Sequence, residues 1–572
     1  MKLIKYLKKY TKEAILGPLF KLFEATLELI VPLVVASIID KGIAEGDTPY
    51  IVKMSLILVL LGAIGLAFSL TAQYFAAKAS VGFVTGIRNG LFKHIQTLTY
   101  SDIDRIGTPT LITRMTTDAS RVQTGLNLAL RLLLRSPFVV FGAMIMALSI
   151  DTSAGTTFAV VIPILSVIVF GIMLITTPLY KKVQSGIDKI LKRTRENLSG
   201  VRVIRAFARE ENEVRDFREE NAALTAAQKR AGHVSALLNP LTYIIINIGI
   251  LYLIYVGALK VDSGDLTQGE VIALYNYMSQ ILVELIKLAN LIVSITRALA
   301  SASRISSAFD IKSTQEYGSC EMASSDGYAV ELRGVSLRYA GSPEDALTDI
   351  SFTASRGETV GIIGGTGSGK SSLVNLIARF YDASEGEVLI NGRCVKEYTK
   401  DAITRAVGIV EQKATLFSGS IRDNIRLGAP DATDEEIYEA LKVAQALDVA
   451  ESHGGLDAEV ASGGKNFSGG QRQRLTIARA LAKKPEILIL DDSSSALDYA
   501  TDARLRTSIK ALSGERTVFI VSQRTASVMH ADKIIVLDDG CAVDIGTHDE
   551  LLTRSTVYRE IYESQFKKEA SV

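Results

Sequence analysis

The sequence contains little cysteine, little histidine and no excess of charge of either sign. Its three cysteines are widely separated among 572 residues and odd in number, which excludes a disulfide framework and a zinc ribbon. Its five histidines are scattered without the spacing of a metal site. Lysine and arginine number 63 against 62 aspartate and glutamate, so the net charge of +1 gives no signal for a nucleic-acid partner.

Long uncharged runs predict that the first half of the chain is a membrane domain. The hydrophobic content is 48% and the mean hydropathy is +0.24. Met54–Ala77, Thr152–Tyr180 and Val234–Leu259 contain 24, 29 and 26 residues without a charge. At about 1.5 Å per helical residue, the shortest of these runs reaches about 36 Å, which exceeds a hydrocarbon layer of about 30 Å. Three such runs argue against the alternative, which is a large soluble core of buried helices.

The charges between the runs indicate how the helices cross the membrane. The pattern predicts about six spans, at residues 14–39, 54–77, 133–150, 156–178, 234–259 and 271–298. The segments 78–135 and 181–230 hold eight and thirteen Lys and Arg residues, whereas the three short connections hold two, none and one. Because basic segments stay in the cytoplasm, we expect both chain ends on the cytoplasmic side of a plasma membrane. The two basic segments are expected to form helices that extend into the cytosol.

The composition changes after about residue 300. Residues 1–310 form the expected transmembrane domain, and residues 311–327 are rich in small, polar and charged side chains and predict a linker. From 328 to 572, short β-branched runs alternate with amphipathic helical patterns. This alternation is typical of an α/β domain.

A phosphate-binding loop lies near the start of this second domain. Val360–Ile363 has the pattern of a buried strand, Gly364–Ser371 follows as G-x-x-x-x-G-K-S, and a helical pattern continues from Ser372. The glycines allow backbone N–H groups to surround a β-phosphate at a helix N-terminus. Lys370 is expected to reach the β- and γ-phosphates, and the Ser371 hydroxyl is placed for Mg²⁺.

An acidic strand end and a second glycine-rich helix start accompany this loop. The apolar run Ile487–Leu490 ends at Asp491, the carboxylate expected beside Mg²⁺ in a P-loop ATPase. Ser468, Gly469 and Gly470 open a helical pattern and predict a second anion cradle, for which the alternative is an ordinary helix cap. One chain has no use for two γ-phosphate cradles, so the second one predicts a nucleotide held between two protomers.

Together these residues resemble the ATP-binding cassette (ABC) family, and the order of the two domains resembles an exporter half-transporter. The matching motifs are Gly364–Ser371 (Walker A), Gln412 (Q-loop), Phe467–Gln471 (signature), Ile487–Asp492 (Walker B), Ser495–Asp498 (D-loop) and Tyr339, the aromatic that stacks on adenine. The resemblance implies an α-helical transmembrane domain of about six long helices, followed by an α/β P-loop ATP-binding cassette. It also implies ATP and Mg²⁺ as cofactors, and a head-to-tail dimer whose ATP sites each join one subunit's Walker motifs to the other subunit's signature.

The same resemblance implies a role for each site residue. The nucleotide-binding residues are Tyr339, Gly364, Gly365, Thr366, Gly367, Ser368, Gly369, Lys370, Ser371, Ser372, Ser468, Gly469, Gly470 and Gln471. The Mg²⁺ ligands are Ser371, Gln412 and Asp491, and the catalytic residues are Asp492, Gln523, Gln412 and Asp498. Two cytosolic turns, near 113–118 and 207–212, are expected to press on the cassettes, the alternative being plain solvated turns.

Two positions depart from the family pattern. Asp492 stands where the family has the glutamate that polarises the attacking water, and Gln523 stands where it has a histidine. Aspartate withdraws the carboxylate by about 1.5 Å, and glutamine cannot become a cation near neutral pH. The signature is intact, so the combination resembles the degenerate-site subunit of a heterodimeric exporter. The alternative is that both changes are tolerated in a working homodimer.

Charged residues inside the predicted spans are candidates for substrate contact. They are Lys21, Glu24, Glu28, Glu284 and Lys287. One hypothesis is an anionic site for a lipophilic cation, and the favoured one is helix-end snorkelling or paired interhelical charges.

We expect a subunit of an ATP-driven exporter that moves lipophilic compounds or drugs outward across the plasma membrane. Its expected partners are a second half-transporter subunit, membrane lipids and a lipophilic small molecule, and no nucleic acid. The alternatives are a homodimeric lipid or peptide exporter and an ATP-gated channel or regulatory membrane protein. Substrate identity rests on analogy alone.

Overall fold

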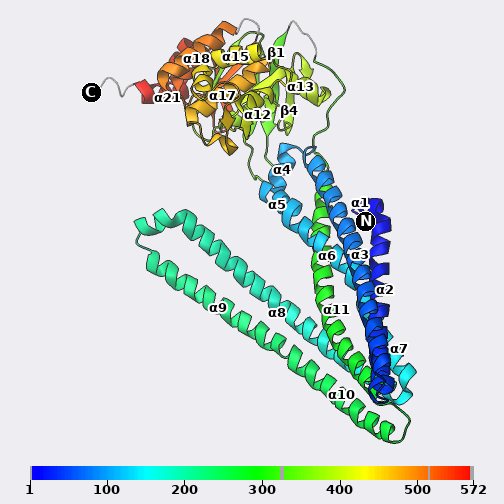
Figure 1. The fold of residues 1–572 in the computed structure, drawn as a ribbon. Coiled ribbons are helices and arrows are strands. Elements are labelled where there is room, and N and C mark those ends of the chain that lie inside the picture. Colours follow the sequence, from blue (N-terminus) through cyan, green and yellow to red (C-terminus); the bar gives the residue numbers. More distant parts are fainter. Residues whose placement is uncertain (1–2, 323–326, 513–515, 567–572) are drawn as a thin grey trace. The chain divides into compact units, whose positions relative to one another are not determined.

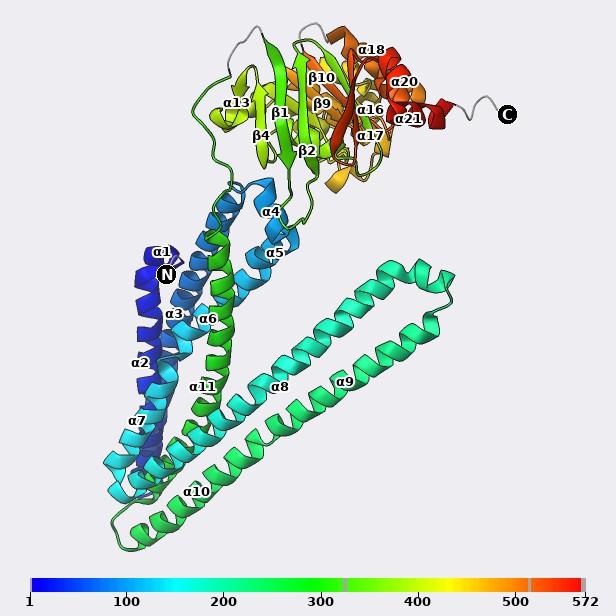
Figure 2. The same cartoon turned by 180° about the vertical axis from the view of Figure 1, so that it is seen from behind.

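The chain forms two compact units in a computed structural model, which describes residues 3–322, 327–512 and 516–566. The helical unit comprises the chain up to Gln96 together with Pro109–Asp310. The α/β unit comprises Thr97–Thr108 together with the chain from Ile311 onward. Each unit is described separately below (Figures 1 and 2).

The helical unit confirms the prediction of six long membrane helices. Among the described residues, six helical stretches are long and apolar enough to cross a membrane: Ile4–Ile43, Thr48–Ile95, Thr108–Ile150, Thr152–Ala206, Glu210–Asp262 and Gln268–Phe309. Their main helices are α2 (Thr11–Ser37), α3 (Thr48–Ile95), α6 (Ala119–Leu132), α7 (Arg135–Ile150), α8 (Thr152–Ala206), α9 (Glu210–Ala236), α10 (Leu238–Asp262) and α11 (Gln268–Phe309). The basic segments that follow the uncharged runs are helical as well, so these helices are longer than a bilayer requires.

The core of the helical unit combines small residues with large aromatic side chains. Ala25, Ala143 and Ala147 are fully buried or nearly so, which lets α2 and α7 approach their neighbours closely. Phe158 and Tyr277 fill the space between the helices. The Tyr277 hydroxyl donates a hydrogen bond of 2.6 Å to the backbone carbonyl of Leu29, which joins α11 to α2.

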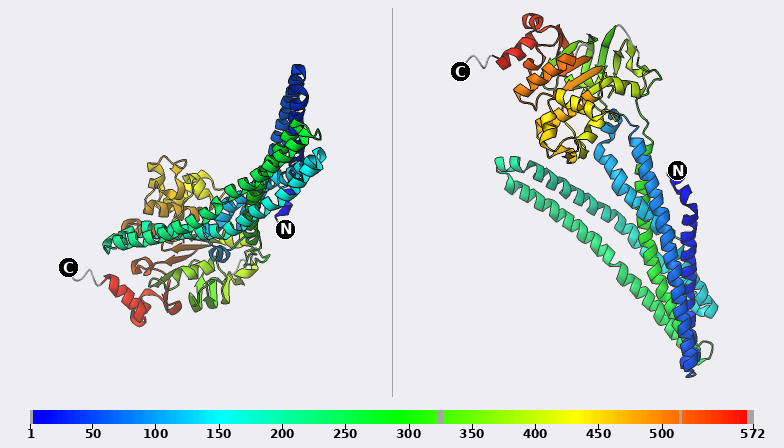
Figure 3. Two further views of the ribbon diagram at one scale, coloured as in Figure 1. Left: turned by 90° about the horizontal axis from the view of Figure 1, so that it is seen from below. Right: turned by 45° about the horizontal axis from the view of Figure 1, so that its top comes forward.

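Helices α8, α9 and α10 form a long hairpin that diverges from the other helices of this unit (Figures 1 and 3). Arg193 of α8 fastens its two arms by donating to Glu213 and Glu220 of α9 at 3.2 and 3.0 Å. The hairpin turns sharply at residues 207–209, where the Phe207 side chain is 73% exposed. This is one of the two turns for which the sequence predicts a contact with a cassette.

The α/β unit contains two main sheets. The first has six strands in the order β12-β11-β3-β10-β9-β6. Its strands are β3 (Thr359–Gly364), β6 (Val407–Val410), β9 (Ile487–Asp491), β10 (Thr517–Val521), β11 (Lys533–Asp538) and β12 (Cys541–Gly546). All pair in parallel except β12, which is antiparallel to β11. The carboxyl ends of β3, β9 and β10 therefore meet at one edge, where the phosphate-binding loop begins.

The second sheet is antiparallel and has the order β2-β1-β4-β5. Its strands are β1 (Tyr328–Leu337), β2 (Leu347–Ser355), β4 (Glu385–Ile390) and β5 (Arg393–Cys394). The helices of the unit are α12 (Lys370–Ile377), α13 (Lys400–Ala406), α14 (Ile421–Arg426), α15 (Asp434–Val443), α16 (Leu447–Ser452), α17 (Gly469–Ala482), α18 (Tyr499–Leu512), α19 (Thr525–Val528), α20 (His548–Arg554) and α21 (Thr556–Phe566). Apolar residues of both sheets and α12 form one continuous core.

A short helix from the first half of the sequence belongs to the α/β unit. Helix α4 (Tyr100–Ile106) begins at a capping box in which Thr99 and Asp102 bond each other's backbone N–H. The Tyr100 ring lies 4.5 Å from that of Phe380, and the Tyr381 hydroxyl donates to Asp104 at 2.6 Å. The aromatic side chains that follow α12 thus hold α4 against this unit.

The predicted position of the first contacting turn, 113–118, is therefore wrong. Those residues continue the helical path from α5 (Thr108–Thr113) into α6, and Asp118 accepts a hydrogen bond of 3.0 Å from Arg304 of α11 inside the helical unit. The Thr99-x-x-Asp102 capping box was the local signal that marks the correct segment.

Asp102 holds α4 in place, and its removal is expected to destabilise the α/β unit. Its side chain is 1% exposed and accepts hydrogen bonds from the Thr99 hydroxyl at 2.7 Å and the Thr314 backbone N–H at 3.2 Å. Asp102→Ala leaves those donors without an acceptor, at a cost of about 1–3 kcal/mol. At neutral pH we expect the thermal unfolding midpoint of the purified protein to fall by about 2–4 °C for each kcal/mol.

The pH dependence of this loss tests its cause. Burial raises the pKa of Asp102, but the hydrogen bonds from Thr99 and Thr314 outweigh it and hold the pKa below its usual value. A lowered pKa in the folded state stabilises the fold above the unfolded value of about 3.9, and this contribution is lost as the pH falls further. The difference between wild type and Asp102→Ala should therefore shrink in acid. An unchanged midpoint at neutral pH, equal to that of the neighbouring Ser101→Ala control, would contradict the assignment.

Candidate nucleotide-binding site

The loop between β3 and α12 takes its shape from close backbone packing. Gly364 ends β3, and a Cβ atom there would lie 2.2 Å from the Leu537 carbonyl oxygen. Gly369 has φ +91°, and a Cβ there would lie 2.8 Å from the Ala346 carbonyl oxygen. By contrast, nothing lies within 4 Å of a Cβ built on Gly365. The loop is therefore fixed at both ends and open in its middle, as a phosphate cradle requires.

The Lys370 ammonium group lies over this loop. It donates to the backbone carbonyls of Gly364 at 3.0 Å and Gly365 at 2.5 Å, and its side chain is mostly buried. Burial lowers the pKa of Lys370, and the nearby carboxylates of Asp492 and Asp491 oppose that shift. A cation with so little solvent has strong affinity for a phosphate that enters the loop.

Asp491 provides an unsatisfied oxygen beside the loop. It ends β9 with 6% of the residue exposed, and its Oδ1 is buried without a hydrogen-bond partner. Burial raises the pKa of Asp491, as does the charge of Asp492, whereas a hydrogen bond with Ser371 lowers it. A carboxylate and a hydroxyl beside a phosphate cradle are oxygen ligands of the kind Mg²⁺ prefers. These residues fit a magnesium ion.

The side chains of Asp492 and Gln412 meet at the same edge. Gln412 Nε2 donates to Asp492 Oδ2 at 3.2 Å. Burial raises the pKa of Asp492, and the hydrogen bond from Gln412 opposes this. The Asp492 backbone has φ +44°, and its N–H donates to the Val521 carbonyl at 3.0 Å. This left-handed conformation is uncommon outside glycine, and aspartate adopts it more readily than most residues.

Gln523 also reaches the phosphate-binding loop, and it is held there by a residue that the sequence did not reveal. Thr366 donates to Gln523 Oε1 at 3.4 Å. The side-chain amide of Gln565, in α21, donates to the Gln523 carbonyl at 2.8 Å and accepts from the Thr525 N–H at 2.9 Å. No motif marks Gln565, because its position depends on how the last helix packs.

Tyr339 lies at the other end of the loop, next to Ser372. Its hydroxyl donates to the Ser372 hydroxyl at 2.9 Å. Its ring meets that of Tyr381 edge to face, with centroids 5.0 Å apart. Since Tyr381 also donates to Asp104, one side chain links the expected adenine position to α4.

The signature residues form a helix start of their own. Ser468 is the N-cap of α17, and its side chain and that of Gln471 bond each other's backbone N–H at 3.2 and 2.8 Å. A Cβ on Gly470 would lie 2.9 Å from the Ala496 carbonyl oxygen. This geometry is compatible with both predictions for the segment, a second anion-binding site and an ordinary helix cap. Within the part of the chain that the structure describes, no hydrogen bond or ion pair joins residues 467–471 to residues 364–372.

Asp498 does not meet the other predicted catalytic residues. It is exposed, and its carboxylate accepts the Thr501 backbone N–H at 3.0 Å; hydrogen bonds from the Thr501 side chain and backbone N–H lower the pKa of Asp498. The structure thus gathers Lys370, Asp491 and Asp492 with the two glutamines at one sheet edge. It leaves Asp498 and the signature outside that cluster.

The fold and this cluster define a class: a membrane-spanning helical unit joined to a P-loop α/β unit built to bind a nucleoside triphosphate. The family models agree with both units. Residues 14–285 match the ABC transporter transmembrane region, and residues 347–495 match the ABC transporter domain. The chain belongs to the ABC transporter family. It is an exporter-type half-transporter, a multi-pass membrane protein whose cassette binds ATP and whose ATP hydrolysis is coupled to transport.

Relatives and a solved structure extend over the whole chain. An uncharacterized ABC transporter ATP-binding protein of Mycobacterium tuberculosis is 38% identical over 98% of this chain and 97% of its own length. The uncharacterized ABC transporter ATP-binding protein YfiB of Bacillus subtilis is 35% identical over 100% and 99%. A bacterial Atm1-family ABC exporter solved with ATP bound shares the fold with a TM-score of 0.77 at 22% identity, covering 98% of each chain.

Gln565 is expected to order the segment that carries Gln523. In Gln565→Ala the Thr525 N–H loses its acceptor, and the Gln523 carbonyl loses its donor. Loss of about 1.4 kcal/mol of local stability raises amide hydrogen exchange about tenfold. We expect that increase at Thr525, measured by exchange and mass spectrometry on the full-length protein. The matched control is Ser564→Ala in the same helix, and equal exchange in the two variants would refute the role of Gln565.

Proposed function

We propose that this chain is the degenerate-site subunit of a heterodimeric ABC exporter in the plasma membrane, with both termini and the α/β unit in the cytoplasm. It moves lipophilic compounds or drugs outward. The observation that carries the proposal is the presence of both Asp492 and Gln523 in one nucleotide site, in a chain whose own signature, Phe467–Gln471, is intact. The chain therefore binds ATP in its own slow site and completes a competent site on its partner.

The chemistry at Asp492 supports a slow site. Its carboxylate is one methylene shorter than that of glutamate, a withdrawal of about 1.5 Å, and Gln412 bonds one of its oxygens. A misplacement of about 1 Å can cost about 10²-fold in rate. The carboxylate of Asp492 is thus withdrawn from the place that a glutamate carboxylate would take, and one of its oxygens already accepts a hydrogen bond from Gln412.

Gln523 removes a second contribution to hydrolysis. Its amide can donate to a γ-phosphate but carries no positive charge at any pH. Its side-chain oxygen accepts a hydrogen bond from Thr366 in the phosphate-binding loop, so its position suits phosphate contact without charge neutralisation. The two substitutions affect different parts of the transition state. Asp492 concerns the attacking water, and Gln523 concerns the γ-phosphate.

The rest of the site supports firm nucleotide binding. Ser371 and Asp491 would hold Mg²⁺, with Gln412 as a third ligand, and the metal would neutralise phosphate charge when bound. Lys370 would hold the β- and γ-phosphates, and Tyr339 would stack on the adenine. These residues bind and orient ATP whether or not water activation is efficient.

Two features support a second subunit. Ser468 and Gly469 of the signature are exposed, and residues 467–471 make no hydrogen bond or ion pair with residues 364–372 in the described chain, which suits a site completed in trans. The diverging hairpin of α8 and α9 exposes large apolar side chains such as Leu174, Leu198 and Phe207. Apolar surface on this scale favours coverage by lipid or by another chain.

The proposal predicts an asymmetry between two substitutions. In the complex purified from its native membrane through a tag on this chain, Ser468→Ala should reduce ATP hydrolysis by about 10²-fold or more. The reason is that a γ-phosphate donor of the competent site is lost. Asp492→Asn should reduce it by less than about threefold, since the slow site contributes little. Equal and complete loss in both variants would contradict the division of roles, and ATP binding by each variant controls for folding.

Restoring the family residues gives the converse test. We expect the chain purified alone, paired only with copies of itself, to hydrolyse ATP slowly. The double variant Asp492→Glu/Gln523→His should hydrolyse it about tenfold faster or more, because both missing contributions return. Lys370→Ala in the double variant is the matched control and should abolish the gain. Rapid hydrolysis and transport by the wild-type chain alone would instead favour a homodimeric exporter.

A further inference from the structure

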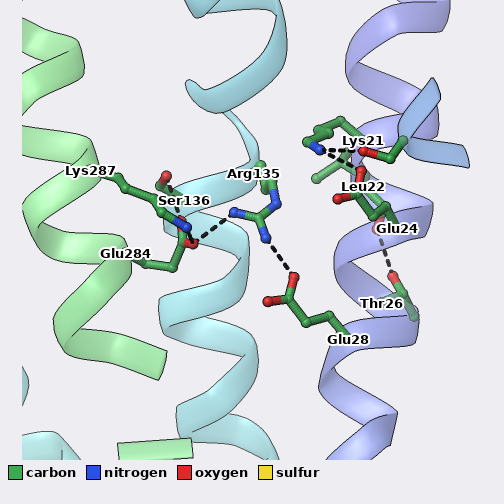
Figure 4. A network of polar contacts seen from close by, with 10 residues as sticks. Lys21, Leu22, Glu24, Thr26, Glu28, Arg135, Ser136, Glu284 and Lys287 are labelled. Atoms are coloured by element: carbon green, nitrogen blue, oxygen red, sulfur yellow. Dashed lines mark hydrogen bonds and ion pairs between the residues drawn. The ribbon is translucent and has the colours of Figure 1, made fainter. Parts of the chain in front are cut away.

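A buried charge network crosses three helices of the helical unit (Figure 4). Arg135 of α7 donates to Glu284 of α11 at 2.7 Å and to Glu28 of α2 at 2.5 Å. Ser136 donates to the second oxygen of Glu284 at 2.8 Å, and Lys287 donates to the first at 2.9 Å. Arg135 is not among the charged candidates that the sequence predicts, because it directly precedes the uncharged run 136–150.

The network lies within three of the helical stretches that are long enough to cross a membrane, Ile4–Ile43, Thr108–Ile150 and Gln268–Phe309. At about 1.5 Å per residue, Glu284 is about 24 Å along α11 from Gln268, and Arg135 is about 22 Å along α7 from Ile150. Arg135 and Glu284 are 6% and 3% exposed. Charges at such positions persist only when they are paired, and the two acids and two bases of this network sum to zero.

A cavity of about 540 Å³ adjoins the network between α2 and α11. This volume is in the range of small-molecule sites. The cavity is lined by Glu28, Val31, Pro32, Val35, Asn276, Ser279, Gln280, Val283, Glu284 and Lys287. One wall thus offers amides, a hydroxyl and charges, and the other is mainly apolar.

Glu28, Glu284 and Lys287 line this cavity, and of the four charges of the network Glu28 and Lys287 are the exposed ones. The side chains of Glu28 and Lys287 are 39% and 45% exposed, whereas those of Arg135 and Glu284 are 7% and 3% exposed. Glu28 bonds Arg135 through one oxygen and Lys287 bonds Glu284, so each keeps bonding capacity for a ligand. Gln280 Oε1 is buried without a hydrogen-bond partner at the same wall. The cavity therefore presents an acceptor on α2, a donor on α11 and an unsatisfied amide.

We propose that this cavity binds a zwitterionic amphiphile as the transported compound, with its ammonium group against Glu28, its anionic group against Lys287 and its apolar body against the valines. The inference rests on the proposed export function and names its substrate class. A ligand with a single charge leaves an uncompensated charge at low dielectric beside a neutral network. A ligand with both charges and no net charge satisfies both walls without that cost.

The proposal differs from both hypotheses that the sequence offered for these charges. A site for a lipophilic cation requires a surplus of negative charge, but Arg135 and Lys287 balance the two glutamates. Purely structural pairing accounts for Arg135 and Glu284, but not for the exposure of Glu28 and Lys287 in a cavity of this size.

Because the chain contains no tryptophan, the fluorescence of one introduced tryptophan can report binding without a signal from other tryptophans. Val35→Trp places a single fluorophore on the cavity wall, on the same helix as Glu28 but about two turns away. The full-length variant, in uncharged dodecyl maltoside micelles and without ATP, is titrated with three probes that share a twelve-carbon chain: dodecyl betaine, dodecyltrimethylammonium and laurate. We expect the betaine to bind about tenfold more tightly than either singly charged probe. Equal affinities, or no saturable change, would overturn the proposal.

A second measurement avoids the reporter substitution. Each probe is added to the wild-type chain, and the shift in thermal unfolding midpoint is recorded, since a ligand that binds only the folded state raises it. We expect the betaine to give the largest shift, and the same order of probes as in the fluorescence titration. A larger shift with laurate or the ammonium probe would count against the charge-balance argument.

Removal of either accessible charge should invert the preference. Lys287→Gln leaves the network at −1 and should favour dodecyltrimethylammonium over the betaine, whereas Glu28→Gln leaves it at +1 and should favour laurate. Glu13→Gln is the matched control, because it removes the same charge from α2 outside the cavity, and it should keep the wild-type order. An unchanged order in Lys287→Gln would overturn the proposal even if Glu28→Gln fails to fold.

The source of the zwitterion is distinguished in the same assay. Phosphatidylethanolamine or phosphatidylglycerol is added to the micelles together with the betaine probe. Competition by phosphatidylethanolamine alone indicates a lipid headgroup, and binding of the betaine without that competition indicates a free small molecule. Both outcomes support the shared chemistry, and stronger competition by phosphatidylglycerol opposes it. Because binding is measured without ATP, the zwitterion proposal can fail while the predicted asymmetry of ATP hydrolysis is observed. Likewise, the asymmetry can fail while the zwitterion binds as expected.

Discussion

The parallel pairing of β3, β9 and β10 is the constraint on which the nucleotide site depends. It brings three strand ends to one edge, so that the residues after Gly364, Leu490 and Val521 face one another across the phosphate-binding loop. Asp491, Asp492 and Gln523 are distant in sequence from Lys370, yet they reach it because their strands are neighbours. Burial at this edge lowers the pKa of Lys370 and raises the pKa of both aspartates, so each charged form lacks solvation that a bound polyanion or cation would replace.

The helical unit depends on the pairing of charged side chains that are buried away from water. A charge far from water needs a partner, and Arg135 obtains two from helices that are separated by more than a hundred residues of sequence. This pairing joins α2, α7 and α11 at one level. It also leaves Glu28 and Lys287 facing the cavity. A ligand in the cavity must therefore leave the charges buried there balanced.

The α/β unit contains a short segment from the first half of the chain. Residues 97–108 lie in the α/β unit although the helices on both sides of them lie in the other unit. Tyr381 contacts Tyr339 on one side and Asp104 on the other. A change at the adenine position therefore has a short physical route to α4, which consists of one ring contact and one hydrogen bond.

Local patterns in the sequence are sufficient to predict six membrane helices, the α/β class of the second unit, and the phosphate loop with its flanking strand and helix. Runs without charge and glycine spacing carry this information within a few tens of residues. Packing in three dimensions makes 100–106, and not 113–118, part of the α/β unit, sets Gln565 against the Gln523 segment, and pairs Arg135 with two glutamates. Each of these depends on which distant side chains become neighbours after packing, and no local pattern encodes that proximity.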